Sequence, residues 1–299
     1  MTRSSSIQLD SFELTIGEMK DADLDALYAL SLSVGWPHRA EDWQIVRDMG
    51  RGIVAHDAIG RVLGSAMWFD FAPDFTIFGM VITSPRLQAL GTGRWMMEHV
   101  LARTGSRALG LSATRSAKRL YDSLGFRAER TVYQCNGEAV APPMEPLPPG
   151  TLLRSVDETD LAEIAALDLA AYGADRTPVL ARLISVSKGV ALFRGGRMIA
   201  FSLCRRFGRG HVIGPVVAAS DEEAIAVTRP HIAGHAGSFM RIDTRQRSGA
   251  FPRFIMRSGL PIYDTVTSMS LRRSWLRGDG APPGDGLPLT YGLASQALG

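Results

Sequence analysis

The spacing of apolar and polar positions predicts alternating strands and helices over the first 138 residues. Residues 7–16 alternate as a half-buried strand does, and Leu24, Leu27, Tyr28 and Leu32 then fall at helical spacing. Further elements are predicted at 41–49 (helix), 52–56, 61–71 and 75–82 (strands), from about 94 (helix), 108–112 (strand), 116–124 (helix) and 126–134 (strand). This order is complete by about Asn136 and predicts one mixed α/β (α+β) unit.

A proline-rich segment separates this unit from the rest of the chain. Residues 139–150 read AVAPPMEPLPPG, with five prolines in twelve positions. Proline lacks the backbone N–H that helices and inner strands need, so the segment predicts a stiff linker. The tail at 277–299 is rich in glycine and proline over its first part. We expect it to be either loosely ordered or an arm over a neighbour.

The chain beyond the linker repeats the first unit. Residues 160–167 match 23–30 in their pattern, a shift of 137 residues along the chain. Further weak matches follow in the same order, and the shift drifts only from 137 to 134 residues. We therefore predict two tandem copies of one fold, at 7–138 and at 151–276.

Composition indicates a globular protein with a sizeable core. Apolar residues make up 45% of the chain and charged residues 21%, and no apolar run approaches the roughly 20 residues of a membrane span. The first ten residues lack the apolar core of a signal peptide, so we expect a cytoplasmic protein that does not bind membranes. The net charge of +3 is mild and the arginines are scattered, which does not favour nucleic-acid binding. Cys135 and Cys204 lie in apolar strand-like contexts and predict core positions.

A glycine-spaced loop follows the apolar strand at 75–82. After a turn at 83–85 the chain reads Gln88-Ala89-Leu90-Gly91-Thr92-Gly93 and then enters an amphipathic helix. A strand, a glycine loop and a helix N-terminus in this order predict an anion site, because backbone N–H groups and the helix dipole face the same point. The spacing is neither G-x-G-x-x-G nor G-x-x-x-x-G-K-[ST], so it does not indicate a dinucleotide or P-loop site.

Two segments of the first unit resemble the GNAT superfamily of acyl-CoA-dependent N-acyltransferases. The loop resembles the family's Q-x-x-G-x-G pyrophosphate loop. Residues 114–126 resemble its segment N-x-x-A-x-x-L-Y-x-x-x-G-F, with matches at Ala117, Leu120, Tyr121, Gly125 and Phe126. Thr114 stands where the family has asparagine, which puts that residue's contact to the pantetheine arm in doubt. The resemblance implies two tandem GNAT-like domains, each a mixed, mostly antiparallel sheet flanked by helices.

The resemblance also implies a reaction and its residues. An acetyl group would pass from acetyl-CoA, as co-substrate, to a primary amine of a small molecule or peptide, by direct attack in a ternary complex and without a metal. Tyr121 would protonate the departing sulfur. Cofactor contacts are expected at Val81, Ile82 and Thr83 of the splayed strand, at Gln88, Leu90, Gly91, Thr92, Gly93 and Arg94 of the loop, and at Thr114. The alternative is a non-catalytic acyl-CoA sensor on the same fold.

The acceptor side is less well marked in the sequence. Trp36 and Trp43 are candidate walls of the acceptor pocket. The strand at 75–82 carries no carboxylate, so the base is sought at Asp70, Asp74 or His56, with a water relay as the alternative. Asp70 is also a candidate substrate contact. The oligomeric state stays open, with a homodimer among the alternatives.

The second copy lacks the chemistry of the first. Its counterpart of the loop, residues 218–224, holds no glycine pair and carries three acidic residues at a predicted helix start. Ile255 stands at the position of Tyr121. These acids would repel a pyrophosphate, so the second copy is predicted to be a degenerate, structural or substrate-shaping domain. His231 and His235 are four residues apart but have no third ligand nearby in sequence, so no metal site is predicted.

Overall fold

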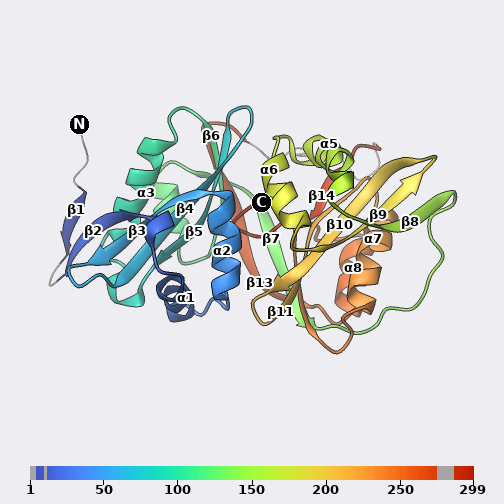
Figure 1. Ribbon diagram of the computed structural model, residues 1–299, viewed down its shortest axis with the longest axis horizontal. Helices are drawn as coiled ribbons and strands as arrows, with labels where there is room; N and C mark the ends of the chain where they lie inside the picture. The colour runs from blue at the N-terminus through green and yellow to red at the C-terminus, as the bar shows by residue number, and fades with distance from the viewer. Residues whose placement is uncertain (1–4, 10–11, 275–285) are drawn as a thin grey trace.

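The computed structural model describes residues 5–9, 12–274 and 286–299 (Figure 1). The first half contains β1 (Ser6–Leu9), β2 (Phe12–Glu18), α1 (Leu24–Ser33), α2 (Ala40–Met49), β3 (Arg51–Asp57), β4 (Val62–Phe71), β5 (Phe75–Thr83), α3 (Thr92–Arg103), β6 (Ala108–Ala113), α4 (Lys118–Ser123) and β7 (Arg127–Glu138). The second half contains β8 (Thr151–Val156), α5 (Leu161–Tyr172), α6 (Thr177–Ile184), β9 (Lys188–Arg194), β10 (Arg197–Phe207), β11 (Gly210–Ala218), α7 (Asp221–Ala233), β12 (Phe239–Thr244), α8 (Ala250–Arg257), β13 (Ile262–Leu271) and β14 (Leu289–Gly292).

One mostly antiparallel sheet runs through both halves. Its strand order is β1-β2-β3-β4-β5-β6-β13-β7-β12-β11-β10-β9-β8, and β14 pairs with β11 off this path. Strand β13 of the second half lies between β6 and β7, while β7 of the first half lies between β12 and β13. The first half therefore gives β7, and the second half β13, to the sheet of the other half. The prediction that the first unit is complete by Asn136 is wrong in this respect, because β6 is hydrogen-bonded to β13 and not to β7.

The starts of two helices have local causes. Helix α1 begins after Asp23, whose Oδ1 accepts a hydrogen bond from the Ala26 N–H at 2.9 Å. Helix α3 begins at Thr92, two residues before the predicted start. Gly91 caps it with φ of 94°, a left-handed conformation that glycine adopts without strain.

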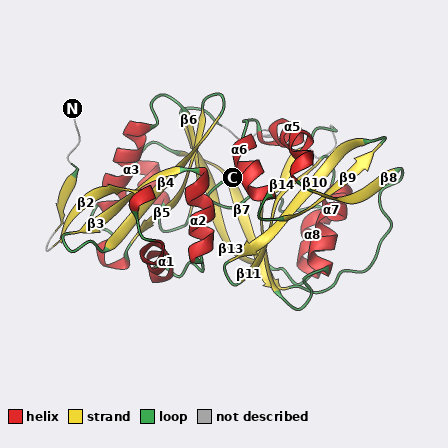
Figure 2. Ribbon diagram, viewed as in Figure 1, coloured by secondary structure: helices red, strands yellow, loops and turns green. Residues whose placement is uncertain are grey.

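Helices cover both faces of the sheet (Figure 2). On one face, α1 and α2 share a single apolar core with α5 and α6 of the other half, and Trp43 and Ile164 are fully buried in it. An ion pair of 3.0 Å between Asp48 and Arg182 joins α2 to α6. Helices α3 and α4 pack in a second core, and α7 and α8 in a third. The two halves are thus packed as one body with a seam between them. Among the described residues, no helix is long and apolar enough to cross a membrane.

The described part of the tail is an arm over both halves. Strand β14 pairs antiparallel with β11, from Val216 opposite Gly292 to Ala218 opposite Leu289. Tyr291, Leu293, Ala294 and Leu298 are fully buried. The alternative of a loosely ordered tail is therefore wrong for residues 289–299. The glycine- and proline-rich stretch at 277–285 lies outside the described residues.

Candidate active site

Strand β5 departs from regular pairing at Met80. The ladder with β4 changes register there, because Met67 pairs with Gly79 whereas Ser65 pairs with Ile82. Met80 has φ of 51°, which is costly for a side chain of this kind, and the Ser65 hydroxyl holds the bulge by donating to the Met80 carbonyl at 2.7 Å. Parallel pairing of β5 with β6 ends at Phe78. The two strands are therefore splayed beyond Phe78, as the resemblance implied.

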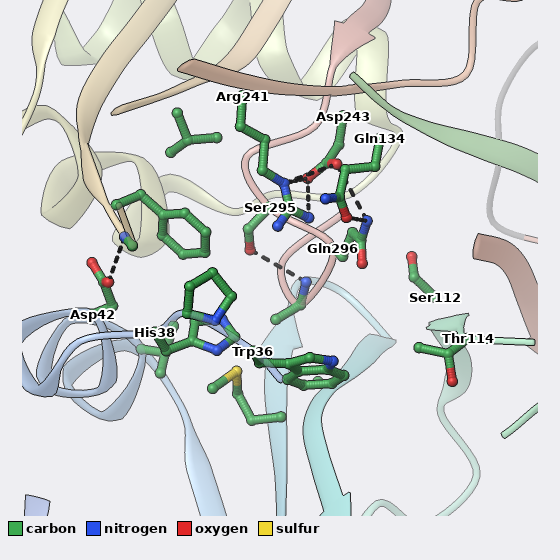
Figure 3. Close-up of a pocket in the computed structure, with 18 of the residues that line it drawn as sticks. Trp36, His38, Asp42, Ser112, Thr114, Gln134, Arg241, Asp243, Ser295 and Gln296 are labelled. Carbon is green, nitrogen blue, oxygen red and sulfur yellow. Dashed lines mark hydrogen bonds and ion pairs between the residues drawn. The ribbon is translucent and has the colours of Figure 1, made fainter. Parts of the chain in front are cut away.

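A cavity of about 580 Å³ opens at this splay. Its walls come from both halves of the chain, and Figure 3 shows how the polar side chains face the apolar ones across it. The lining includes Trp36, His38 and Asp42 after α1, Phe78–Val81 of β5, Leu111, Ser112 and Thr114 of β6 and its end, Tyr121 of α4, Gln134 of β7, Phe207 of β10, Arg241 and Asp243 of β12, and Ser295–Ala297 of the tail. The cavity lies at the seam that the exchanged strands create.

Tyr121 reaches the cavity from helix α4. The side chain is only 5% exposed and packs edge-on against Phe126, with ring centroids 5.9 Å apart. Burial raises the pKa of the Tyr121 hydroxyl well above its ordinary value. The phenol is therefore protonated at every physiological pH and can act as a hydrogen-bond or proton donor inside the cavity.

The glycine loop lies at the start of α3, close to the end of the splayed strand. Helix α3 has no side-chain cap and no acidic residue in its first turn, so its N–H groups and dipole stay available to an anion. A Cβ on Gly93 would lie 3.2 Å from Leu120, so the glycine permits the close packing of α3 on α4. Arg94 pairs with Glu98 at 3.1 Å and donates to the Ser123 hydroxyl at 3.0 Å. Gln88, Leu90, Gly91 and Arg94 are exposed, whereas Thr92 is buried.

In the second half, the chain's own carboxylates lie at the start of α7, the position that corresponds to the start of α3. Helix α7 carries Asp221, Glu222 and Glu223 in its first turn, and its cap Ser220 accepts a hydrogen bond from the Glu223 N–H. The Asp221 carboxylate also accepts from the Phe251 N–H at 3.0 Å. These carboxylates satisfy the N-termini of α7 and α8 and oppose an anion there. Ile255, at the position of Tyr121, is fully buried.

Only some of the residues predicted to contact the acceptor line the cavity. Trp36 lines the cavity, and Thr114 lies at its β6 edge. Trp43 is fully buried, and its indole N–H donates to the Ser31 hydroxyl at 2.7 Å, so it is a core residue behind the wall. The cavity lining does not include Asp70, which accepts from Thr76 Oγ1 at 2.6 Å and pairs with Arg51 and Arg107.

The three candidate bases do not reach the cavity either. Asp74 pairs with Arg273 at 2.9 Å, and His56 of β3 packs beside Gly17 of β2. Asp70 and Asp74 lie at the β4–β5 turn, at the opposite end of β5 from the bulge. Asp70 and Asp74 were candidate bases because they are close to β5 in the sequence. The two ends of a nine-residue strand lie far apart, however, and both residues are at the end away from the cavity.

Several polar groups of the cavity were not predicted. His38 follows the Gly35-Trp36-Pro37 break that the sequence marks, and its Nδ1 is buried without a partner among the described residues, as is Ser112 Oγ. Such atoms are unusual in a folded protein and fit the expectation of a bound ligand. Gln134, Asp243 and Gln296 come from three distant segments (Figure 3), and no local sequence signal marks them.

The two buried carboxylates of the cavity are already bound. Asp42 accepts from the backbone N–H and guanidinium of Arg39 and from the Gly208 N–H at 2.9 Å. Asp243 is 1% exposed and pairs with Arg241 through two nitrogens. Both carboxylates therefore already accept hydrogen bonds from the chain's own groups, whereas the Nδ1 atom of His38 has no partner in the described part of the chain.

The pKa of His38 is lowered to about 4, mainly because the ring is buried; the nearby Asp42 carboxylate opposes this shift and the positive charge of Arg241 adds to it. The ring lies among aromatic side chains, 5.6 Å from Trp36 and 5.2 Å from Phe207 between centroids. It is therefore neutral at pH 7. A neutral imidazole can accept a proton.

This shift predicts a loss of stability in acid. Well above pH 6.5, His38 is neutral in both the folded and the unfolded chain. Between pH 6.5 and pH 4, His38 binds a proton in the unfolded chain but not in the folded chain. We expect His38 alone to lower the free energy of unfolding by roughly 1 to 2 kcal/mol at pH 5 relative to pH 7. Urea unfolding at both pH values should show a correspondingly smaller loss for His38→Gln. An identical loss in both proteins would contradict the shift.

Comparisons with known proteins support this geometry. The family described as Acetyltransferase (GNAT) domain matches residues 164–280. This match identifies a GNAT acetyltransferase domain in the second half of the chain. The "Uncharacterized N-acetyltransferase YitH" of Bacillus subtilis (strain 168) is 27% identical over 286 residues, which cover 94% of this chain and 97% of that protein. The resemblance that the glycine loop and the Tyr121 segment indicated is confirmed, and the chain is an acyltransferase.

Two solved structures share this fold over most of the chain. A Pyrococcus horikoshii protein named "Putative Acetyltransferase" has a TM-score of 0.76 at 16% identity, and the match covers 100% of this chain and 99% of that one. A tandem GNAT protein from the clavulanic acid biosynthesis pathway has a TM-score of 0.62 at 12% identity, with 86% and 98% covered. At such identities the likeness shows the fold alone. The prediction of tandem GNAT-like domains is confirmed, and the second half, despite its altered loop, is the half that the family description matches.

Proposed function

We propose that the protein transfers an acetyl group from acetyl-CoA to a primary amine of a small molecule or peptide, with both substrates bound together. The observation that carries this proposal is the bulge at Met80, which opens into the same cavity as the buried hydroxyl of Tyr121. A thioester needs hydrogen-bond donors for its oxyanion and a proton for its sulfur, and these two features supply both kinds of group.

The residues present fit acetyl-CoA along its whole length. The uncapped start of α3 with Gly91 and Gly93 suits the pyrophosphate, and the splayed edge of β5 at Val81–Thr83 suits the pantetheine amides. Ser112 Oγ and Thr114 at the opposite edge could bind the same arm, since Ser112 Oγ has no partner among the described residues. The bound thioester would then lie at the bulge, and it supplies the electrophilic carbon of the reaction.

The transfer forms a nitrogen–carbon bond and breaks the carbon–sulfur bond. The neutral amine attacks the thioester carbon, and backbone N–H groups at the bulge stabilise the oxyanion. His38 takes the proton that the nitrogen loses and relays it to solvent. Tyr121 donates to the departing sulfur, and the proton can pass because burial in the same cavity also disfavours a thiolate. The phenol then regains its proton from solvent.

The experiment that tests the proposal measures thiol release from acetyl-CoA over a panel of amines. The wild-type chain should release thiol with at least one primary amine and form the corresponding amide, detected by mass spectrometry. Gly91→Val should weaken acetyl-CoA binding at least tenfold, because a branched side chain opposes φ of 94° in the loop. Gly105→Val, at another exposed left-handed glycine away from the cavity, is the matched control. Tight acetyl-CoA binding without amide formation from any amine would favour the acyl-CoA sensor.

One acetyl-CoA site per chain is a separate expectation. The acidic start of α7 and strand β14 together fill the counterpart site, and Pro215 at the position of Met80 has no N–H to offer an oxyanion. Calorimetric titration with acetyl-CoA should give a stoichiometry of about one. Two equivalent sites would contradict the assignment of the second half as a domain without its own cofactor.

A further inference from the structure

The segment after β14 is the part of the cavity wall that the established family resemblance does not explain. In the first half the gap between β5 and β6 is open and forms the cavity. In the second half the equivalent gap lies between β11 and β12, whose pairing ends at Ile213 and Ile242. Strand β14 pairs with β11 beyond that point, and the Leu293 N–H donates to the Asp243 carbonyl of β12 at 2.8 Å. The chain's own tail thus bridges the second gap.

The tail emerges from that gap as a short, closed loop. The Ser295 carbonyl accepts from the N–H groups of Leu298 and Gly299, at 3.2 and 3.0 Å, and the Ala294 N–H donates to the Gly299 carbonyl at 3.1 Å. The Ser295 hydroxyl accepts from the Ala297 N–H at 3.3 Å. These bonds fix the conformation of residues 295–297, which line the cavity (Figure 3).

Two buried arginines hold this loop at its two ends. Arg205, which is 5% exposed, donates to the Ala294 carbonyl at 3.0 Å. Arg176, which is 1% exposed, donates to the Leu298 and Gly299 carbonyls at 3.2 and 2.8 Å. Buried arginines are rare, and here their charge-assisted hydrogen bonds anchor a segment that forms no regular element. The loop is therefore a rigid part of the cavity wall.

The loop places Gln296 beside the reacting centre. Ala297, the next residue, packs on Gly79 of the bulge so closely that a Cβ on Gly79 would lie 2.6 Å from the Ala297 Cβ. Gln296 Nε2 donates to Asp243 Oδ1 at 3.2 Å and to Gln134 Oε1 at 3.3 Å. A carboxylate only accepts, so the amide nitrogen must face Asp243. Its Oε1 then points the other way, and no described residue donates to it.

We infer that Gln296 is a positioning residue for the acceptor, and that its amide oxygen accepts a hydrogen bond from the N–H of the incoming primary amine. This inference rests on the proposed function. It gives the second half a role in the reaction: that half carries β11, β12 and both arginines, which hold the loop against the acetyl-CoA site of the first half. The amide oxygen carries no formal charge, so it stabilises the ammonium form of the acceptor less than a carboxylate at this position would.

The test compares Gln296→Met with the wild-type chain and with Gln246→Ala. Methionine keeps the length of the side chain and removes the acceptor oxygen. Gln246 follows strand β12, which carries Asp243, but does not line the cavity. Three quantities are measured: kcat/KM for the best amine of the panel, the Kd of acetyl-CoA, and the slow hydrolysis of acetyl-CoA without amine. We expect kcat/KM for the amine to fall at least tenfold in Gln296→Met, with the other two quantities within twofold of wild type, and Gln246→Ala to match wild type throughout.

The remaining outcomes each overturn something specific. An unchanged kcat/KM for the amine would overturn the positioning role. A parallel fall of amine transfer, hydrolysis and acetyl-CoA binding would assign Gln296 a structural role and overturn the inference equally. If the wild-type chain releases thiol with no amine of the panel, the proposed function itself fails, and this inference fails with it.

Discussion

Tyr121→Phe is expected to lower kcat for thiol release by at least tenfold, and by roughly 10²-fold if general-acid catalysis has its usual size. The substitution removes one hydroxyl from a buried side chain that lines the cavity and retains the edge-on packing on Phe126. The sulfur must then leave as a thiolate without a proton from the buried phenol. Steady-state kinetics with the best amine of the panel gives kcat, and calorimetry gives the Kd of acetyl-CoA.

The control for this prediction is the binding of acetyl-CoA. The proposed role places the Tyr121 hydroxyl at the sulfur and not at the pyrophosphate loop, so the Kd should stay within about twofold of wild type. Tyr133→Phe is a matched variant, since Tyr133 is a partly buried tyrosine of β7 outside the cavity lining. If Tyr121→Phe retains full turnover, the acid is another group; if the Kd also rises strongly, the hydroxyl serves binding.

The first-half site could be predicted because its signals are contiguous in the sequence. Gly91 and Gly93 follow a strand directly, and Tyr121 sits in a helix whose end is marked by Gly125 with φ of 89°. The structure assigns the strand, loop and helix to the expected places and brings Trp36, Val81, Thr114 and Tyr121 to one cavity. Such local patterns need only a few residues of chain to form.

The rest of the cavity could not be predicted, because it depends on long-range pairing. Asp243 and Gln134 become neighbours only when β7 enters the second half's sheet beside β12. Gln296 is brought to the cavity by the pairing of β14. It belongs to a tail whose glycine and proline content was compatible with either an ordered arm or a loosely ordered segment. Hydrophobic periodicity predicts which residues form a strand, but it does not say which half of a repeated fold that strand will join.

The Asp168–Arg176 pair should show how strongly the tail depends on the second half. Both side chains are essentially unexposed and join through two nitrogens, at 2.7 and 2.9 Å. We expect Asp168→Asn to lower the free energy of unfolding by about 3 to 5 kcal/mol, because it leaves the guanidinium buried without its counter-charge. Urea unfolding followed by circular dichroism gives the difference from wild type. A change below about 1 kcal/mol would mean that the charge is compensated by other groups.

A double variant separates stability from the position of the tail. Asp168→Leu with Arg176→Met replaces the pair by apolar side chains of similar volume, and such replacements of a buried ion pair are often neutral. Stability should therefore recover relative to Asp168→Asn. The double variant lacks the Arg176 donors to the Leu298 and Gly299 carbonyls, so the loop at 295–297 loses one of its two arginine anchors and keeps the bonds from the Tyr172 hydroxyl and the Ala294 N–H. If the loop positions the acceptor, the double variant folds and binds acetyl-CoA normally yet has a raised KM for the amine. A normal amine KM would show that Arg205 and the backbone bonds of the loop are sufficient to hold it.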